Sequence, residues 1–307
     1  MKIVVLDALT YGDTSLDEFK TLGEVEIYST TDAEEVCDRV CDAEVIVTNK
    51  VVINDAVMAA AQPLKLICVA ATGTNNIDHD AAERRGIAVK NVAGYSTDAV
   101  VQHTFSMLFY LLGHSRYYDE YVKRGDWQRE QVFAHIGPSF SELRGKKWGI
   151  IGLGEIGRNV ARIARAFGAD VWYYSTSGKN ADNEFEQTTL SRLLEQSDIV
   201  SIHAPLNPQT QNLISHSELL QLKDGAVLLN LGRGGIVDED ALSVILDVKP
   251  IYVGLDVLAK EPMKSAHPLL AIKHSERLYV TPHIAWTSRE ARKRLIAATV
   301  ENIRSLT

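Results

Sequence analysis

The glycine-rich segment Gly152-Leu153-Gly154-Glu155-Ile156-Gly157 constrains the fold of this chain more than any other feature. It follows an apolar run typical of a buried strand and opens a helical pattern that extends to Phe167, the context in which such a segment is informative. Gly152 permits a tight turn, Gly154 lets the backbone approach a pyrophosphate, and Gly157 lets helix and strand pack closely. The helix N-terminus presents free N–H groups to phosphates. The segment predicts a dinucleotide-binding turn, and the alternative is a glycine-rich turn without a ligand.

Short apolar runs alternate with helical patterns on both sides of this segment, as expected for parallel α/β units. We expect a first series of strands at residues 2–7, 24–28, 44–48, 65–70 and 87–90. We expect a second series at residues 147–151, 170–174, 198–202, 226–230, 251–255 and 277–280, with helices at 155–167 and 238–246. Thr14–Asp17 and Asn54-Asp55 resemble helix starts. A long apolar helix at about 97–123, capped by Ser96-Thr97-Asp98, joins the two series, and a last helix follows at about 287–306. The fold class is therefore α/β.

Size, charge and cysteine content narrow the class of protein. A chain of 307 residues suggests two domains. The net charge of -8, with both signs scattered, argues against a nucleic-acid-binding protein but not against an acidic substrate. Cys37, Cys41 and Cys68 show no metal-binding spacing, so we expect buried packing residues in a reducing compartment. No segment resembles a signal peptide or a membrane span, which favours a cytoplasmic protein without a membrane partner.

The strand after the glycine turn lacks the acid that usually holds the adenosine ribose. Val171–Tyr174 leads instead into Ser175-Thr176-Ser177-Gly178-Lys179. Ser175 and Thr176 can hydrogen-bond to a hydroxyl or to a phosphate. Lys179 is either a partner for a 2′-phosphate or a solvated loop lysine. The sequence therefore leaves NAD and NADP both open as the cofactor.

Three strands of the second series lead into polar residues, at the edge where open α/β sheets bind ligands. These residues are Arg233 in Asn230-Leu231-Gly232-Arg233-Gly234-Gly235, Asp256 and Glu261 in Leu255–Pro262, and His283 in Thr281-Pro282-His283. Arginine can hold a carboxylate and a neighbouring 2-oxo group with forked hydrogen bonds. Taken singly, each residue is more often a surface ion pair, a solvated acid or a structural histidine. Their joint position behind a dinucleotide turn favours a catalytic set.

The chemistry of hydride transfer needs these residue types. Hydride addition to a carbonyl carbon leaves negative charge on oxygen, which an imidazolium can neutralise by donating a proton. A carboxylate beside the imidazole holds its tautomer and stabilises its protonated form. Arg233, Glu261 and His283 therefore predict an oxidoreductase that interconverts a small 2-hydroxy acid and a 2-oxo acid.

These segments resemble the D-isomer-specific 2-hydroxyacid dehydrogenase family across nearly the whole chain. The carrying residues are Gly152–Gly157, Asn230–Leu242, Leu255-Asp256-Val257 with Glu261-Pro262, and Thr281–Ala285. The resemblance implies two Rossmann-like domains: a discontinuous, flavodoxin-like substrate domain of residues 1–96 plus 285–307, and a doubly wound NAD(P)-binding domain of residues 97–284. It also implies a cleft that closes on substrate, and a homodimer built through the cofactor domains.

The resemblance also implies roles for individual residues. Arg233 would bind substrate, Glu261 would orient the histidine, and His283 would donate the proton. Ala71–Asn76, with Thr72, Gly73 and Thr74 at its centre, resembles the loop whose N–H groups grip the substrate carboxylate, and the alternative is an ordinary turn. The remaining cofactor contacts would be Glu155 and Ile156 at the pyrophosphate, Pro205 on the adenine side, Asp256 at the nicotinamide carboxamide, and Leu231 and Gly232 in the cofactor-binding segment.

Within the family, Tyr173–Lys179 and Ile284-Ala285-Trp286 look like members that are glycerate dehydrogenases or hydroxypyruvate reductases. Trp286 is compatible with a small substrate pocket, or with a packing role. The leading hypothesis is thus a reductase of hydroxypyruvate or glyoxylate. A dehydrogenase for a larger acid, with Lys50 or Arg144 near a phosphorylated substrate, is one alternative. A dinucleotide-sensing binding protein of the same fold is the other.

Overall fold

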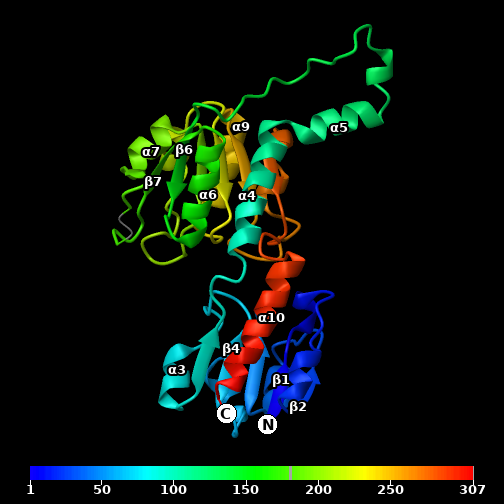
Figure 1. Cartoon of the computed structure of the whole chain (residues 1–307), viewed down its shortest axis with the longest axis vertical. Helices are drawn as coiled ribbons and strands as arrows, with labels where there is room; N and C mark the ends of the chain where they lie inside the picture. The colour runs from blue at the N-terminus through cyan, green and yellow to red at the C-terminus, as the bar shows by residue number, and fades with distance from the viewer. Residues whose placement is uncertain (180–181, 307) are drawn as a thin grey trace. The chain divides into compact units, whose positions relative to one another are not determined.

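The chain folds into two compact units in the computed structural model, which describes residues 1–179 and 182–306 (Figure 1). Unit 1 comprises Met1–Ser96 and the chain from Trp286 onward, and unit 2 comprises Thr97–Ala285. The chain returns from unit 2 to unit 1 between Ala285 and Trp286, one residue later than expected from sequence. Ala285 belongs to unit 2 because it is buried in the core of that unit.

Unit 1 is built on a five-stranded parallel sheet in the order β2-β1-β3-β4-β5. Its strands are β1 (Lys2–Val5), β2 (Glu24–Ile27), β3 (Val45–Thr48), β4 (Leu66–Val69) and β5 (Ala88–Asn91). Strands β3 and β4 are wholly buried, whereas the edge strands β2 and β5 are partly exposed. The helices of this unit are α1 (Val36–Val40), α2 (Asp55–Ala60), α3 (His79–Arg84), α10 (Arg289–Arg304) and the 3-10 helices η1 (Ala8–Tyr11) and η2 (Asp17–Thr21). This strand order is the flavodoxin-like arrangement.

A helix begins at both of the places expected in unit 1, but one is an α-helix and the other a 3-10 helix. Asn54 caps α2, because its side chain accepts a hydrogen bond of 3.0 Å from the Val57 N–H. The segment after Thr14 leads only into the short 3-10 helix η2, whose N-cap Leu16 provides no side-chain acceptor.

Unit 2 is built on a seven-stranded parallel sheet in the order β12-β11-β10-β9-β6-β7-β8. Its strands are β6 (Lys147–Ile151), β7 (Asp170–Tyr174), β8 (Glu186–Gln187), β9 (Ile199–Ile202), β10 (Val227–Asn230), β11 (Tyr252–Leu255) and β12 (Leu278–Val280). Its helices include α6 (Glu155–Ala166), α7 (Leu190–Gln196), α8 (His216–Gln221) and α9 (Glu239–Val248), with 3-10 helices η4 (Pro268–Leu270) and η5 (Ser275–Arg277). The order changes direction between β6 and β9, which is the doubly wound arrangement. The α/β prediction is confirmed, and each expected strand overlaps an observed one; the two-residue edge strand β8 was not expected.

The single helix expected at 97–123 is wrong. The chain forms two helices, α4 (Thr97–Leu112) and α5 (Ser115–Lys123), separated by Gly113 and His114. His114 has a left-handed backbone (φ +48°), which an α-helix cannot contain. Helix α4 buries eight residues, whereas α5 buries none. The two helices consequently have different surroundings, although the apolar pattern runs through both.

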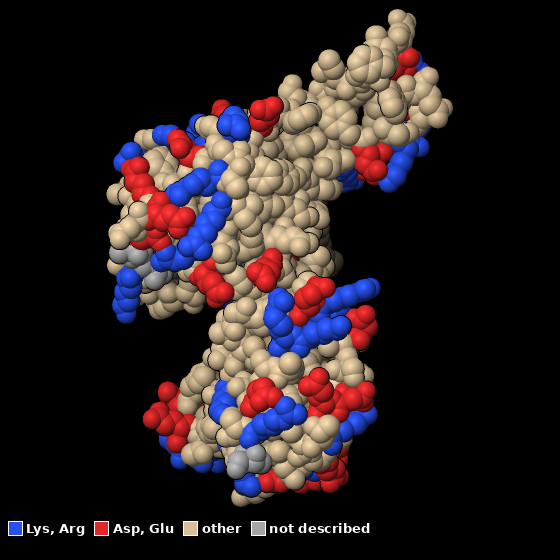
Figure 2. Space-filling model, viewed as in Figure 1, with Lys and Arg blue, Asp and Glu red and all other residues tan. Residues whose placement is uncertain are grey.

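An arm of unit 2 begins at α5 and returns to β6 through η3 (Trp127–Arg129) and an irregular segment, and Figure 1 shows it extending away from the sheet of its own unit. Aromatic side chains link α5 to the irregular segment: the rings of Tyr121 and His135 stack with centroids 3.8 Å apart, and the Tyr117 hydroxyl lies 2.9 Å from His135 Nε2. Several large apolar side chains of the irregular segment are exposed, namely Val132, Phe133, Ile136 and Phe140. Figure 2 shows few charged side chains toward the end of the arm.

The cysteines differ in their surroundings. Cys68 is buried in β4, and this burial raises the pKa of its thiol to about 12. Cys37 is half-buried, but Cys41 is exposed, so the expectation of a buried packing role is wrong for Cys41. The reason is that α1 ends at Val40, which leaves Cys41 in the turn that follows.

Two further findings concern the described residues as a whole. No group of three or more His, Cys, Asp or Glu side chains in residues 1–179 and 182–306 is arranged to hold a metal ion. None of the helices in the same ranges is long and apolar enough to cross a bilayer.

Candidate active site

The glycine turn joins β6 to α6 and has the geometry of a phosphate cradle. Gly152 adopts φ +91°, and a Cβ there would lie 2.9 Å from the Cα atom of Ala204. A Cβ on Gly157 would lie 2.2 Å from the Gly152 carbonyl oxygen, whereas a Cβ on Gly154 would meet nothing within 4 Å. Gly154 is the N-cap of α6 and provides no side-chain acceptor for the first N–H groups. The open space at Gly154 and the uncapped helix N-terminus fit a pyrophosphate.

A buried hydroxyl lies at the end of the neighbouring strand. Strands β6 and β7 pair with Ile151 opposite Tyr174, and the Gly152 N–H donates to the Tyr174 carbonyl over 3.0 Å. Ser175 follows directly, and its buried Oγ has no hydrogen-bond partner within the described part of the chain. A buried polar group without a hydrogen-bond partner is unfavourable. Its position beside the glycine turn fits a dinucleotide whose ribose would provide the partner.

Other expected cofactor contacts lie around the same edge of the sheet. A Cβ on Gly232 would lie 2.7 Å from the Ala204 carbonyl oxygen, which brings the segment after β10 against the segment after β9. Leu231 is buried, whereas Pro205 and Glu155 are exposed and Ile156 and Thr176 are half-buried. Lys179 is also exposed, and its N–H donates to Ser177 Oγ over 3.2 Å.

The loop after β7 carries an acid that sequence reasoning missed. Asp182 forms an ion pair with Arg158 in the first turns of α6. The Asp182 N–H donates to the Tyr173 hydroxyl over 3.1 Å. The pair thus ties this loop to the helix that begins at the glycine turn. No local signal could have found it, because the contact forms only when the loop folds back on α6.

Strand register brings the segments of Arg233, Glu261 and His283 to one edge of the unit 2 sheet. Asn230 at the end of β10 pairs with Leu255 at the end of β11, which in turn pairs with Val280 at the end of β12. The segment after β10 also packs closely on the segment after β11. A Cβ on Gly234 would lie 1.9 Å from the Leu258 carbonyl oxygen, so only glycine fits there.

The structure brings His283 and Glu261 into direct contact. His283 Nδ1 lies 2.7 Å from Glu261 Oε2, and Glu261 Oε1 accepts a 2.9 Å hydrogen bond from the Leu258 N–H. Their side chains are 24% and 33% exposed, so the pair is accessible to a substrate. A carboxylate only accepts hydrogen bonds, so Nδ1 must carry the proton. Nε2 is therefore the ring atom left for acid–base chemistry.

The segment that carries His283 is held by the buried carboxylate of Asp256. Oδ1 accepts hydrogen bonds from Thr281 Oγ1 (2.6 Å) and the Ile284 N–H (2.8 Å), and Oδ2 accepts one from the Ala285 N–H (2.9 Å). The His283 N–H donates to the Asp256 carbonyl over 2.9 Å. His283 itself has φ +56°, a region that non-glycine residues rarely adopt. Asp256 therefore holds the histidine's backbone in an uncommon conformation that local sequence does not favour.

Arg233 lies half-buried at the end of β10. Its Nη1 donates to the Gly232 carbonyl over 2.8 Å, and its own carbonyl accepts from Asn230 Nδ2 over 2.9 Å. No carboxylate of the described residues forms an ion pair with its guanidinium. Its charge is therefore not neutralised by a protein acid, which suits it to an anionic ligand.

The segment that carries Glu261 has its own brace, which sequence reasoning also missed. Glu239 at the first turn of α9 accepts a hydrogen bond of 2.6 Å from the Ala259 N–H. Its other oxygen lies 3.0 Å from His267 Nε2, and both side chains are 11% exposed. Glu239 and His267 thus hold the backbone beside Glu261 but do not touch the His283–Glu261 pair.

In unit 1, Thr72, Gly73 and Thr74 form the loop after β4. Thr72 is anchored at its carbonyl, which accepts from Asn91 Nδ2 over 2.6 Å, and Thr74 Oγ1 lies 2.8 Å from His79 Nε2. Within the described chain, the N–H groups of Thr72, Gly73 and Thr74 donate to no protein acceptor. The loop therefore offers three backbone donors. Trp286, also in unit 1, packs edge-to-face on Tyr95 with ring centroids 6.2 Å apart.

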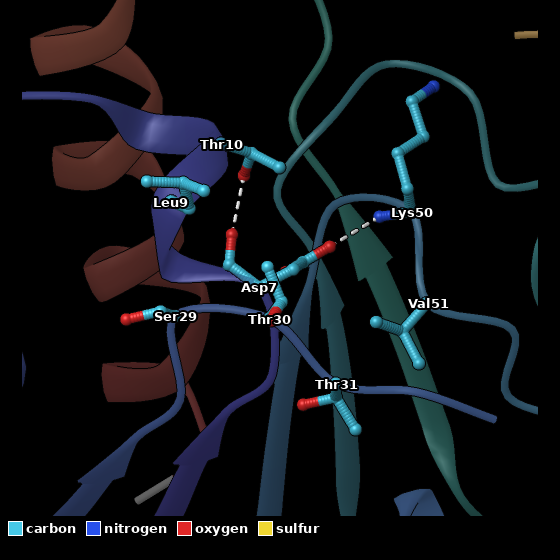
Figure 3. A pocket seen from close by; sticks show the side chains of 8 residues that line it. All are labelled: Asp7, Leu9, Thr10, Ser29, Thr30, Thr31, Lys50 and Val51. Carbon is cyan, nitrogen blue, oxygen red and sulfur yellow. Dashed lines mark hydrogen bonds between the residues drawn. The ribbon is translucent and has the colours of Figure 1, made fainter. Parts of the chain in front are cut away.

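Unit 1 also contains a cavity of about 450 Å³ beyond the ends of β1, β2 and β3 (Figure 3). Its lining includes Asp7, Thr10, Thr30, Thr31, Lys50 and Val51. The Asp7 carboxylate accepts hydrogen bonds from the N–H groups of Asn49 and Lys50, while Figure 3 shows the Lys50 side chain extending away from it. Burial raises the pKa of the Asp7 carboxyl, although these donors oppose the effect. Asp7 thus ties the loops after β1 and β3 together.

Comparison with known proteins agrees with this geometry. The family model described as D-isomer specific 2-hydroxyacid dehydrogenase, NAD binding domain, matches residues 105–285. A hydroxypyruvate reductase from Blautia hydrogenotrophica is 36% identical over 99% of this chain and 96% of its own length. A glycerate dehydrogenase from Methylorubrum extorquens is 36% identical over 98% of this chain and 95% of its own length.

A solved structure of an acyclic imino acid reductase in complex with NADPH and D-Arg superposes with a TM-score of 0.87. It is 30% identical, and the alignment covers 100% of this chain and 97% of that one. Sequence, fold and strand-edge residues therefore lead to one conclusion: the chain belongs to the D-isomer-specific 2-hydroxyacid dehydrogenases, a family of NAD-dependent oxidoreductases.

Proposed function

We propose that this enzyme reduces small 2-oxo acids of the glyoxylate and hydroxypyruvate class to the corresponding 2-hydroxy acids. The observation that carries the proposal is the 2.7 Å contact between His283 Nδ1 and Glu261 Oε2, at the sheet edge that also carries Arg233. The names of the two relatives support this substrate class, since one is a hydroxypyruvate reductase and the other a glycerate dehydrogenase.

The roles of the three residues follow from their chemistry. The nicotinamide cofactor supplies the hydride in reduction and accepts it in oxidation. Arg233 binds the substrate carboxylate and polarises the 2-oxo group through forked hydrogen bonds. His283 donates a proton from Nε2 to the carbonyl oxygen as negative charge develops there, and neutral His283 accepts that proton in the reverse direction. Glu261 keeps the Nδ1 proton in place and stabilises the imidazolium.

We propose that the cofactor lies along the carboxyl edge of the unit 2 sheet. The pyrophosphate would meet Gly152, Gly154, Glu155, Ile156 and Gly157, the adenosine would meet Ser175, Thr176 and Pro205, and the nicotinamide half would meet Leu231, Gly232 and Asp256. Both oxygens of Asp256 already accept protein donors. Each carboxylate oxygen can accept more than one hydrogen bond, so a carboxamide contact is compatible with that arrangement.

The cofactor is NAD or NADP, and Ser175 is the position that tests the choice. No acid follows β7 directly, so nothing there repels a 2′-phosphate, and the imino acid reductase in the comparison holds NADPH. Placing a carboxylate at this position with Ser175→Asp would repel the phosphate of NADPH and favour the ribose hydroxyls of NADH. The measurement is the ratio of kcat/KM for the two cofactors. An unchanged ratio would place the ribose elsewhere.

Unit 1 is proposed as the substrate domain, with the free N–H groups of Thr72, Gly73 and Thr74 as donors to the substrate carboxylate. A crystal structure with cofactor and oxamate would test these contacts together with those of Arg233 and His283. Oxamate bound without any of the three N–H groups would remove this part of the proposal.

The activity is tested by following NADH and NADPH oxidation with glyoxylate, hydroxypyruvate, phosphohydroxypyruvate and branched 2-oxo acids. We expect the first two to give the highest kcat/KM. A preference for a larger or phosphorylated acid would change the substrate class. Binding of NADH without turnover of any acid at high enzyme concentration would favour a dinucleotide-sensing protein of the same fold.

We also propose that the protein works as a cytoplasmic homodimer in which the arm of unit 2 contacts a second copy of the chain. Phe133 and Ile136 are each 91% exposed, which is unusual for large apolar side chains on a monomer. Light scattering of wild type should give the mass of a dimer. The double variant Phe133→Ser/Ile136→Ser should shift the mass toward the monomer, and an unshifted dimer would mean that another surface is used.

A further inference from the structure

A second histidine contacts the anchor of the His283 segment. His103 lies on α4, about 180 residues before that segment in the chain, and its side chain is 17% exposed. Its Nε2 lies 3.1 Å from Thr281 Oγ1 and 3.6 Å from Asp256 Oδ1. Helix α4 packs along β10, β11 and β12, and this packing places His103 beside the ends of β11 and β12.

The direction of these hydrogen bonds follows from their chemistry. Asp256 is flanked by donors, so Thr281, whose Oγ1 lies 2.6 Å from Oδ1, donates its hydroxyl proton to the carboxylate. The Thr281 oxygen can then accept a hydrogen bond, and His103 Nε2 lies 3.1 Å from it. His103 must therefore carry a proton on Nε2. Burial lowers the pKa of this imidazole, while the Asp256 charge opposes the effect, and the lowered pKa favours the neutral ring.

The result is a one-way chain of donors that ends on a buried carboxylate. His103 donates to Thr281, Thr281 donates to Asp256, and Asp256 also accepts from the Ile284 and Ala285 N–H groups. Those two N–H groups follow His283 directly. Reversing the direction of the hydrogen bonds at Thr281 would therefore disturb the backbone that holds His283 at φ +56°.

We propose that His103 is a positioning residue for the reaction: by fixing the proton order of Thr281 and Asp256, it holds the 281–285 segment so that the His283 ring stays directed at Glu261. The inference rests on the proposed function, because it assigns His103 to the acid–base step carried out by His283. His103 does not touch the His283–Glu261 pair in the described contacts, so it acts through Asp256.

The kinetic test compares two replacements of His103 in the full-length protein. His103→Leu removes the donor, and we expect kcat for glyoxylate reduction to fall about tenfold, as for loss of one buried hydrogen bond. The KM for glyoxylate should change less than kcat, because Arg233 is untouched. His103→Gln retains an N–H donor and should recover most of kcat. Gln102→Leu, at the exposed neighbouring position of α4, is the matched control and should behave as wild type.

Coupling to Thr281 separates this role from a general packing role. If His103 acts through the Thr281 hydroxyl, the double variant His103→Leu/Thr281→Val should be no slower than Thr281→Val alone. Additive losses in kcat would overturn the inference. So would a His103→Leu enzyme with wild-type kcat, or a His103→Gln variant that is no better than His103→Leu at equal thermal stability.

A second readout does not depend on activity. Hydrogen exchange of the amides of Ile284 and Ala285 should be faster in His103→Leu than in wild type or Gln102→Leu, because their acceptor loses its fixed geometry. If wild type turns over none of the 2-oxo acids but the exchange changes as expected, the proposed substrate class is wrong. The role of His103 in holding residues 281–285 would still be supported. Unchanged exchange in His103→Leu would overturn the inference whatever the activity.

Discussion

The two segments that carry the acid–base pair differ in how they are held. The His283 segment is anchored on Asp256, which is 2% exposed and accepts three hydrogen bonds from residues 281–285. The Glu261 segment is braced by Glu239 and His267, which are partly exposed and contribute one backbone contact, at Ala259. A buried charge with all its donors in place is costly to disturb, whereas a partly solvated pair is not.

This difference indicates that the backbone at His283 must be held more firmly than the backbone at Glu261. The histidine has an uncommon backbone conformation, which persists only where the surroundings enforce it. The glutamate needs only to reach the ring, and its own Oε1 helps to hold its segment by accepting from the Leu258 N–H. We therefore expect the enzyme to tolerate changes around Glu261 better than changes around His283.

The largest expected effect comes from removing the acid–base group itself. His283→Gln should lower kcat by about 10²–10⁴-fold, the usual contribution of a positioned acid or base. Stability should change little, because the ring is partly exposed. The measurements are the steady-state kcat for glyoxylate reduction and the thermal melting temperature. His274→Gln, at an exposed surface histidine, is the control. A His283→Gln enzyme within tenfold of wild type would assign the proton to another group.

Asp256→Asn should break the stronger anchor and affect both activity and folding. The amide nitrogen cannot accept a hydrogen bond, so it must face a backbone N–H of Ile284 or Ala285 that then lacks an acceptor. An unsatisfied buried donor costs about 1–3 kcal/mol, and kcat should fall by more than tenfold as the His283 backbone relaxes. Denaturant unfolding and initial rates check both. Asp240→Asn, at an exposed position of α9, should change neither. Equal effects of the two variants would contradict the anchor.

Glu239→Gln should disturb the weaker brace and have a smaller effect. The amide oxygen can still accept from the Ala259 N–H, while the charged partner of His267 is lost. We expect a stability loss of about 1 kcal/mol or less and a kcat within about tenfold of wild type. Parallel assays with Asp256→Asn check the ranking. A Glu239→Gln enzyme that is slower than Asp256→Asn would reverse the comparison.

The smallest expected effect is a loss of stability at low pH that arises from His103, which contacts the anchor of the His283 segment. The pKa of His103 is lower in the folded chain than its ordinary value of 6.5, so the unfolded chain binds this proton more readily. The stability contributed by neutral His103 is therefore present above pH 6.5 and is lost as pH falls through its folded pKa. Wild type should lose more unfolding free energy between pH 7 and pH 5 than His103→Gln. Identical slopes would show that His103 does not respond to pH as expected.

Sequence patterns predicted the strands because buried parallel strands are short apolar runs bounded by turn residues. They also predicted that Arg233 and His283 lie just past strand ends, because each residue follows such a run within three positions. They failed for the helix at 97–123, because the break at His114 is a backbone conformation with no strong residue signal beyond Gly113. They also missed His103, Asp182, Glu239 and His267, since each contacts a residue remote in the chain or on another element.

The amino-acid sequence alone determined the α/β class, the glycine turn and the residue types available at the strand ends, because these follow from local periodicity and from motifs of a few residues. Only the tertiary structure decided which side chains meet: that His283 pairs with Glu261, that Asp256 holds the histidine's backbone, and that a helix from the start of unit 2 reaches this anchor. The physical reason is that hydrogen bonds of about 3 Å depend on strand register and helix packing, which arise from contacts between segments far apart in the chain.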